Sequence, residues 1–307
     1  MDTRKVLVIL LIIGSLCLSG CISGSNENLE RWNEGVDTAN ASLTKGNTSQ
    51  TAMQVAWESG MYTQAYTKGN EAIGHYDDAI DEITDLDGVA KDLKKDFLED
   101  YVDAWKNQVQ ANVDYTENVM MLIAIEHYND AYYDFFTAYV PAESQYIDAV
   151  NYYNASNYQA AISTCDLTRQ KWVQLQTKAE EMVGIAARIN IGYVTEYSAG
   201  LRTMCTHVIT AVDYLRSAAV EARNGNLGNA DAYISLQNTA DDAYITSINA
   251  LIALENAYPS AFPDSGDVLV PTYNTYYDRA AQAQADITTY RNEMDSIVAD
   301  NKDFFDV

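Results

Sequence analysis

His75 is the histidine whose neighbours come nearest to a metal site. Glu71 lies four residues before it and Asp78 three residues after it, so a helix would place the three side chains on one face. Imidazole and carboxylate groups together bind transition metals. The set is therefore a candidate metal site, with the alternative that an acidic helix brings these groups together without binding anything.

The other two histidines differ in their surroundings. His127 lies with Glu126, Asp130 and Asp134 in a second acidic neighbourhood, which could also bind a cation or be a chance product of an acidic helix. His207 is followed by two apolar residues, which favours a packed or half-buried ring. Neither has glutamate three residues before it, the spacing that holds di-iron centres in helix bundles. A heme-attachment motif, a glycine-rich phosphate loop and a Gly-x-Ser-x-Gly elbow are also absent from the sequence. We expect no cofactor, and an exported metal-dependent enzyme is the least favoured function.

Cys21 closes a segment that has the three zones of an export signal. The segment starts with Arg4 and Lys5, continues with an unbroken apolar run over residues 6–13, and ends in Leu-Ser-Gly-Cys21. The last four residues resemble the lipobox of bacterial and archaeal lipoproteins. The alternative is an uncleaved transmembrane helix, but the apolar stretch over residues 6–18 is short against the ~20 residues that span a bilayer.

The lipobox resemblance implies how the chain is divided and where it is held. Residues 1–20 would be a removed signal peptide, and a diacylglyceryl group on Cys21 would anchor the exported chain to the membrane, outside the cytoplasm. Residues 21–28 are mostly small and polar and predict a flexible tether. Residues 29–307 would form the exported helical domain.

The formal net charge of −25 bears on the partners of the chain. Such a charge repels nucleic acid and anionic lipid headgroups, so we expect neither as a partner. A solvated acidic surface explains the charge most simply, and loose cation binding or a saline habitat are alternatives. Three Asn-x-Ser sequons, at Asn40, Asn47 and Asn154, predict glycosylation if the host modifies exported proteins.

Tyrosine is unusually frequent, with 23 residues against 6 phenylalanines. A tyrosine ring can be buried while its hydroxyl stays hydrated, which suits interfaces and ligand grooves, and equally suits the boundary layer of a helix bundle. The aromatic clusters that we single out are Tyr132, Tyr133, Phe135, Phe136 and Tyr139, then Tyr152 and Tyr153, and last Tyr273, Tyr276 and Tyr277.

Apolar spacing predicts an all-α fold, an antiparallel bundle of long helices. Steps of four and three residues, typical of a bundle seam, recur in two runs. The first run is Ala161, Cys165, Thr168, Trp172, Leu175, Ala179 and Met182. The second is Ala187, Ile191, Val194, Ser198, Leu201, Cys205, Val208, Val212, Leu215, Ala219 and Ala222.

Further helices and the loops follow from weaker patterns. We expect a long helix from near Val89 towards Tyr139, another through residues 233–251, and a last helix from Pro271 to about Asp303. The predicted loops are 140–142, 184–186, 224–229 and 257–271.

Three short segments share one turn pattern, in which a small residue lies two positions before an apolar residue and an alanine lies three positions after that apolar residue. The small residues are Gly60, Ser156 and Gly225. The pattern resembles the inter-helix turn of tetratricopeptide repeats. The spacings of 96 and 69 residues do not match a period near 34. We favour shared helix-turn-helix chemistry over a degenerate repeat.

Cys165 and Cys205 both fall on the predicted seams. A turn centred near residue 185 would place them level with each other in an antiparallel hairpin, and export would permit a disulfide. A turn at Gly192 would separate them by roughly 21 Å, too far for a disulfide. We predict the turn near 185 and close sulfur atoms, with either a disulfide or two free buried thiols.

Two functions remain in competition. A surface-tethered interaction or scaffold module would present an exposed apolar or tyrosine patch to an unknown surface protein. A small-molecule binding or sensing lipoprotein would instead have a pocket between helices. We favour the first.

Overall fold

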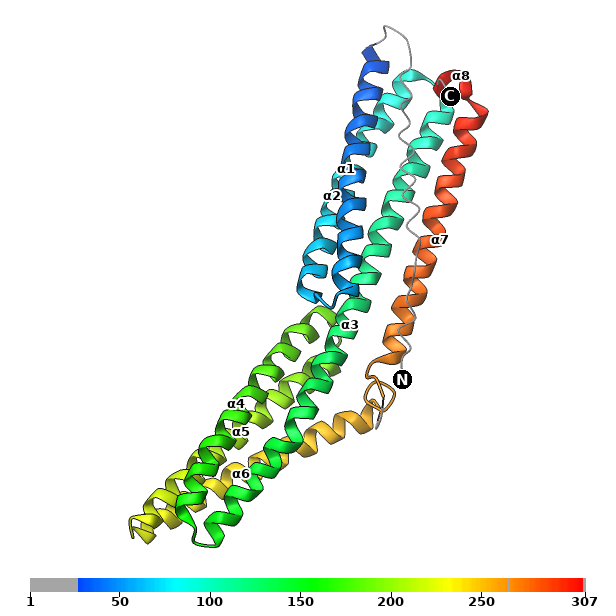
Figure 1. Cartoon of the computed structure of the whole chain (residues 1–307). Helices are drawn as coiled ribbons and strands as arrows, with labels where there is room; N and C mark the ends of the chain where they lie inside the picture. The colour runs from blue at the N-terminus through cyan, green and yellow to red at the C-terminus, as the bar shows by residue number, and fades with distance from the viewer. Residues whose placement is uncertain (1–26, 264–265, 306–307) are drawn as a thin grey trace. The chain divides into compact units, whose positions relative to one another are not determined.

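The structure is a computed structural model that describes residues 27–263 and 266–305 (Figure 1). Within these residues the regular structure is entirely helical, which confirms the predicted all-α fold. The helices are α1 (Glu27–Glu58), α2 (Tyr62–Leu93), α3 (Asp96–Asn154), α4 (Tyr158–Ile189), α5 (Gly192–Arg223), α6 (Leu227–Ala257), α7 (Val270–Asp300) and α8 (Lys302–Phe305).

The chain forms two compact units, although the sequence predicted a single helical domain. Unit 1 contains α1, α2, the part of α3 up to Ile123, and the chain from Asn274 onward; unit 2 spans Ala124–Tyr273. The predicted tether overlaps α1 by two residues, Glu27 and Asn28. Cys21 and the preceding signal segment lie outside the described residues.

Unit 1 has an apolar core built by α1, α2, α3, α7 and α8. Trp32, Ile83 and Trp105 are among its buried residues, and Met294 with Val298 adds one face of α7. Glycine lets α1 and α2 approach closely, because a Cβ at Gly46 would lie 2.5 Å from Cε1 of the buried Tyr76 ring.

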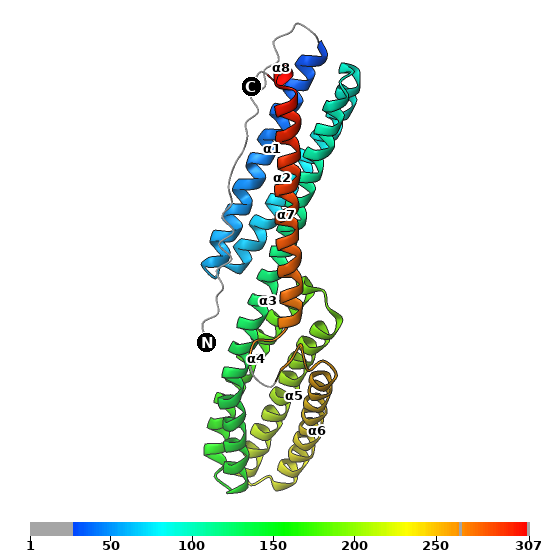
Figure 2. The ribbon, with the colours of Figure 1, turned by 90° about the vertical axis from the view of Figure 1, so that its right-hand side faces the viewer.

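Unit 2 is a four-helix bundle formed by the second part of α3 with α4, α5 and α6. Short turns at 155–157, 190–191 and 224–226 make consecutive helices antiparallel. Figure 2 shows α4, α5 and α6 lying side by side, in agreement with the contacts of α5 with both of its neighbours. Hydrogen bonds between α6 and α3 close the bundle, for example from Tyr146 to Asp241.

The two predicted seams form the core of unit 2. All seven residues of the first run are buried in α4. The second run is buried from Val194 to Ala222 in α5, but its first two members belong elsewhere. Ala187 is exposed near the end of α4, and Ile191 lies in the turn.

The three predicted turn segments adopt one conformation. Gly60, Ser156 and Gly225 each occupy the left-handed region, with φ of 71°, 56° and 82°. In each turn the next residue donates its backbone N–H to a carbonyl five residues earlier, as at Asn157 to Tyr152 (2.9 Å). This pair of features is the Schellman motif that ends a helix. The shared turn chemistry is therefore confirmed.

Two predicted loops are wrong. Residues 140–142 are helical, and Pro141 lies inside α3, which continues to Asn154. Residues 184–186 are also helical, because α4 continues to Ile189 and the turn uses Asn190 in the left-handed conformation. The predicted helix start near Val89 is wrong too, since that residue belongs to α2. The predicted loops 224–229 and 257–271 do lie between helices, but both are too long, because α6 already begins at Leu227 and α7 at Val270. Pro271 lies in the first turn of α7.

Candidate functional site

Tyrosines recur every seven residues along the part of α3 in unit 2, at Tyr132, Tyr139, Tyr146 and Tyr153. Seven residues are nearly two helical turns, so the four side chains share one face. Three of them lie against residues of α5 or α6, and Tyr153 packs on Tyr158 with ring centres 5.5 Å apart. Tyr132, Tyr139 and Tyr153 belong to the aromatic clusters that the sequence shows, whereas Tyr146 and the regular spacing that identifies the face were not predicted.

Tyr139 and Tyr244 meet at the carboxylate of Glu143. Their hydroxyl oxygens lie 2.7 Å apart, and each lies 3.0 Å from Oε1 of Glu143. Trp172 packs edge-on against both rings and donates its indole N–H to the Ala142 carbonyl at 3.3 Å. The group therefore joins α3, α4 and α6 in a single polar layer.

One layer further along, Tyr146 donates a hydrogen bond to Oδ1 of Asp241 at 2.6 Å. Gln237 donates its amide N–H to the Tyr146 hydroxyl at 3.0 Å and also to the other Asp241 oxygen. Burial raises the pKa of Asp241 above its ordinary value, and the hydrogen bond from Tyr146 opposes that shift. These are the groups with which α6 contacts α3 at this level.

At the opposite end of the same face, Tyr197 of α5 donates to Oε1 of Glu255 at 2.6 Å. Its ring stacks on Phe262 with a centroid distance of 4.4 Å and lies beside Tyr132 at 6.2 Å. Burial raises the pKa of Tyr139 to about 12 and that of Tyr197 further. Phenols with such pKa values stay neutral near pH 7, so they act as hydrogen-bond donors to the carboxylates. Tyr132 and Tyr139 are half-buried, as in a boundary layer, whereas Tyr197 is fully buried.

Asn129 holds the connection from α6 to α7 in place. Its role was not predicted from the sequence. Its side-chain oxygen accepts the backbone N–H of Val268 at 2.7 Å, and its amide nitrogen donates to the Val268 carbonyl at 3.0 Å. Leu269 then continues with a positive φ of 62° into α7. A single asparagine in a helix gives no sequence signal for a contact 139 residues away.

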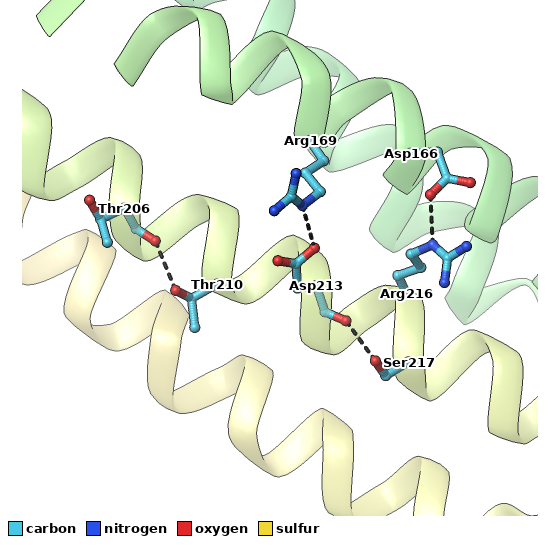
Figure 3. Close-up of polar contacts among 7 residues, drawn as sticks. All are labelled: Asp166, Arg169, Thr206, Thr210, Asp213, Arg216 and Ser217. Carbon is cyan, nitrogen blue, oxygen red and sulfur yellow. Dashed lines mark hydrogen bonds and ion pairs between the residues drawn. The ribbon is translucent and has the colours of Figure 1, made fainter. Parts of the chain in front are cut away.

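The outer face where α4 meets α5 carries a ladder of cross-helix polar pairs (Figure 3). Arg169 Nε of α4 binds Asp213 Oδ1 of α5 at 2.9 Å. In the second pair the arginine is on α5 and the aspartate on α4, with Arg216 Nε 2.6 Å from Asp166 Oδ1. The ladder continues in both directions with the Gln159–Arg223 and Gln176–Thr206 pairs. In each of the four pairs the residue numbers add to 382, so the antiparallel register is the same along the whole face.

This register corrects the prediction for the two cysteines. In this register Cys165 of α4 is level with Ser217 of α5. Cys205 lies in α5 as well, 12 residues before Ser217. At ~1.5 Å per residue the axial offset is about 18 Å, too far for a disulfide. Both thiols are free and buried. Burial raises the pKa of each to about 12, which leaves them protonated and unreactive near neutral pH.

The histidines do not assemble a metal centre. Nδ1 of His75 lies 3.8 Å from Oδ2 of Asp78, but Glu71 is instead paired with Lys68 at 2.6 Å. In the described ranges no three His, Cys, Asp or Glu side chains are arranged to hold a metal ion.

Around His127 the acidic residues pair with other elements. His127 Nε2 lies 3.4 Å from Glu181, and Asp134 is bound by Lys178 at 3.0 Å. Burial lowers the pKa of His127, while Glu181 opposes this shift. His207 is half-buried, as its apolar neighbours predicted.

The surface of the described chain offers two apolar features. A hollow of about 490 Å³ lies along α1 and the start of α2, lined by Thr44, Asn47, Thr48, Thr51, Ala52, Val55, Ala56, Met61 and Gln64. The second feature is a row on α6, in which Leu227, Ile245 and Ile252 are 61%, 52% and 46% exposed. Over the part of the chain that the structure describes, no helix is long and apolar enough to cross a membrane.

Comparison of the chain with protein-family models, curated proteins and solved structures finds no match.

Proposed function

We propose that this chain is an exported lipoprotein, held on the outer side of a membrane by lipid on Cys21, whose helical body binds a partner protein. The basic, apolar and lipobox zones of residues 1–21 support the anchor. A diacylglyceryl group supplies two acyl chains, which is the number that stable anchoring requires.

The apolar row on α6 is the observation that carries the binding role. Leu227, Ile245 and Ile252 are separated by 18 and 7 residues, each close to a whole number of turns, so they share one stripe. Other positions of α6, including Tyr244 and Leu251, face the core of unit 2. A helix that is apolar on its outer side as well as its inner side suits a second contact, and exposed apolar rows mark protein interaction sites.

The hollow on α1 favours a second candidate, binding of a small apolar molecule. The polar groups that line this hollow are less available to a ligand than the residue types suggest. Thr44, Thr48 and Thr51 each donate their hydroxyl to a carbonyl four residues earlier in α1, at 2.8–2.9 Å. The threonine methyl groups then form much of the surface. Few polar groups remain to orient a ligand, which makes this the lesser candidate.

The anchor is tested by fractionating cells that express the full chain or Cys21→Ser. We expect the unaltered chain in the membrane fraction, with an N-terminal peptide whose mass shows acylated Cys21. Cys21→Ser should lose both properties. An unaltered chain that keeps residues 1–20, or one that is membrane-bound to the same extent without Cys21, contradicts the anchor.

The binding role is tested with a photoreactive residue placed at position 252. We expect a crosslinked partner protein, and we expect Ile245→Ser in the same chain to reduce the yield several-fold. Leu167→Ser is the matched control, because Leu167 is 52% exposed on α4 and lies away from the row. Equal yields in the two serine variants, or no adduct from position 252, would contradict a role for this row.

A further inference from the structure

The structure places the three sequons in different surroundings. Asn40 and Asn47 lie inside α1 and are half-buried, whereas Asn154 is the last residue of α3 and is exposed. The sequence alone treats the three as equivalent. Their accessibility in the folded chain separates them.

Asn47 is engaged in the fold of unit 1. Its Oδ1 accepts a hydrogen bond from the hydroxyl of Tyr76 at 2.9 Å. Residues 40–42 and 47–49 are also held by the backbone hydrogen bonds of a continuous helix. An enzyme that modifies the amide must take the asparagine and the two residues after it into its active site. At these two sequons that step requires local unfolding of α1.

Asn154 begins the tight turn between α3 and α4 instead. Asn154, Ala155 and Ser156 are all exposed, so the complete sequon lies on the surface. The backbone of the turn is closed by short hydrogen bonds, including Ser156 N–H to the Tyr153 carbonyl at 2.9 Å. The folded chain therefore presents this sequon with its helix already ended.

The backbone conformation of Ser156 also distinguishes the third sequon. Ser156 occupies the left-handed position with φ of 56°, where the two other turns of this type use Gly60 and Gly225. A residue with a Cβ is disfavoured in that conformation, a cost that glycine avoids. Within the described residues Ser156 Oγ makes no hydrogen bond that would offset the cost. Its hydroxyl is, however, the group that completes the sequon of Asn154.

We infer that Asn154 is the N-glycan acceptor of the folded chain and that Asn40 and Asn47 are not. The inference rests on the proposed export, because the glycan donor would be a lipid-linked sugar phosphate on the outer side of the membrane. The Asn154 amide nitrogen forms a bond to the anomeric carbon of the sugar. The bond from that carbon to the phosphate oxygen breaks, the lipid phosphate leaves with the electron pair, and the amide gives one proton to the enzyme.

The acceptor geometry is tested on the purified full chain with an oligosaccharyltransferase that accepts Asn-x-Ser and its lipid-linked donor. For the native chain we expect one added glycan, located on Asn154 by peptide mass spectrometry. Denatured chain is the matched control and should accept glycans at all three sequons. Modification of native Asn40 or Asn47 at a similar rate, or none at Asn154 while the denatured control reacts, overturns the inference.

Ser156→Gly separates the role of the hydroxyl from the stability of the turn. This variant should keep or raise the thermal stability of the chain and lose the glycan. If the glycan persists in Ser156→Gly, the assigned role of the hydroxyl is wrong.

A final arm expresses the full chain in a prokaryotic host that processes lipoproteins and carries such a transferase. Acylated Cys21 together with glycosylated Asn154 supports both proposals. Acylated Cys21 with bare Asn154 overturns the glycan inference and leaves the anchor intact. A chain that retains residues 1–20 and carries no glycan overturns the proposed export, and the inference that rests on it.

Discussion

Asp241 is a carboxylate of unit 2 whose protonation the fold alters. Burial raises its pKa, although Tyr146 and Gln237 both donate hydrogen bonds to it. A raised pKa in the folded state means that the folded chain holds this proton more tightly than the unfolded chain does. The contribution of Asp241 to stability is therefore lost as the pH rises from its ordinary pKa of 3.8 through the folded value.

Asp241→Asn should remove this pH-dependent loss. We expect the free energy of unfolding of the variant, relative to the unaltered chain, to rise as the pH increases from about 4 through the raised pKa of the folded state. Urea unfolding at several pH values measures the difference. Asp148→Asn is the control, since its carboxylate is exposed on α3 and does not contribute to the shift at Asp241. A difference that stays constant with pH would show that burial does not perturb Asp241.

For single residues, the sequence predicted which side chains are buried better than it predicted which side chains bond to each other. The positions from Val194 to Ala222 were found because apolar spacing along one helix is a local property. The partnership of Glu143 with Tyr139 and Tyr244 depends on how α6 lies against α3, about 100 residues apart in the chain. No local pattern fixes that register, so the polar layer could not be predicted.

Pro141 shows how an element can override a local signal. It lies inside the 59-residue α3, is exposed, and cannot donate a hydrogen bond to the Thr137 carbonyl. The neighbouring Ala142 is buried and its carbonyl accepts from Trp172. Tertiary packing of α3 thus outweighs the disfavoured proline, which is why the predicted loop at 140–142 is absent.

Pro141→Ala should therefore stabilise the chain. We expect a gain on the order of 1–3 kcal/mol in the free energy of unfolding, because alanine restores the N–H and relieves the clash with the preceding turn. Chemical denaturation of unit 2 measures the gain. Pro271→Ala provides the comparison, since Pro271 lies in the first turn of α7, where proline is favourable. An equal or larger gain at position 271 would contradict this account.

The error in the predicted position of the α4–α5 turn has a related cause. Gly184 suggested a helix end, yet it lies inside α4, with nothing near the place of its absent side chain. Asn190 ends the helix instead, in the left-handed conformation with φ of 54°. Asparagine tolerates that conformation, but the many asparagines of this chain make it a poor guide on its own. The 4–3 spacing continues through the buried Ala186 and Ile189 and locates the true end.

For the molecule as a whole, helical content was predictable and the division into two units was not. The continuous α3 carries no break at the boundary near Ile123, and α7 returns to unit 1 from the far end of the sequence. Both features depend on contacts between distant segments. The tyrosine surplus, by contrast, is a property of both units, since Tyr115 in unit 1 and Tyr139 in unit 2 are each raised in pKa to about 12 by burial.

This burial predicts unfolding at alkaline pH. Buried tyrosines keep their protons in the folded chain, whereas in the unfolded chain they ionise near the ordinary value of 10. The stability that they contribute is complete below pH 10 and is lost as the pH rises through their folded pKa values. We expect cooperative loss of helical circular dichroism between about pH 10 and pH 12, together with a steep rise in tyrosinate absorbance. A gradual rise in absorbance while the helices persist would contradict this.

Helices α1, α2, α4 and α5 are each 32 residues long. One residue inserted into α4 would rotate everything beyond it by about 100° and carry buried side chains such as Trp172 towards solvent. Only additions close to a whole number of turns, such as about 7 or 11 residues, preserve the facing positions, and in a hairpin the opposite helix must grow by the same amount. In the history of such a chain, length would therefore change by duplication of matched blocks on both sides of a turn, while the turn itself stays unaltered.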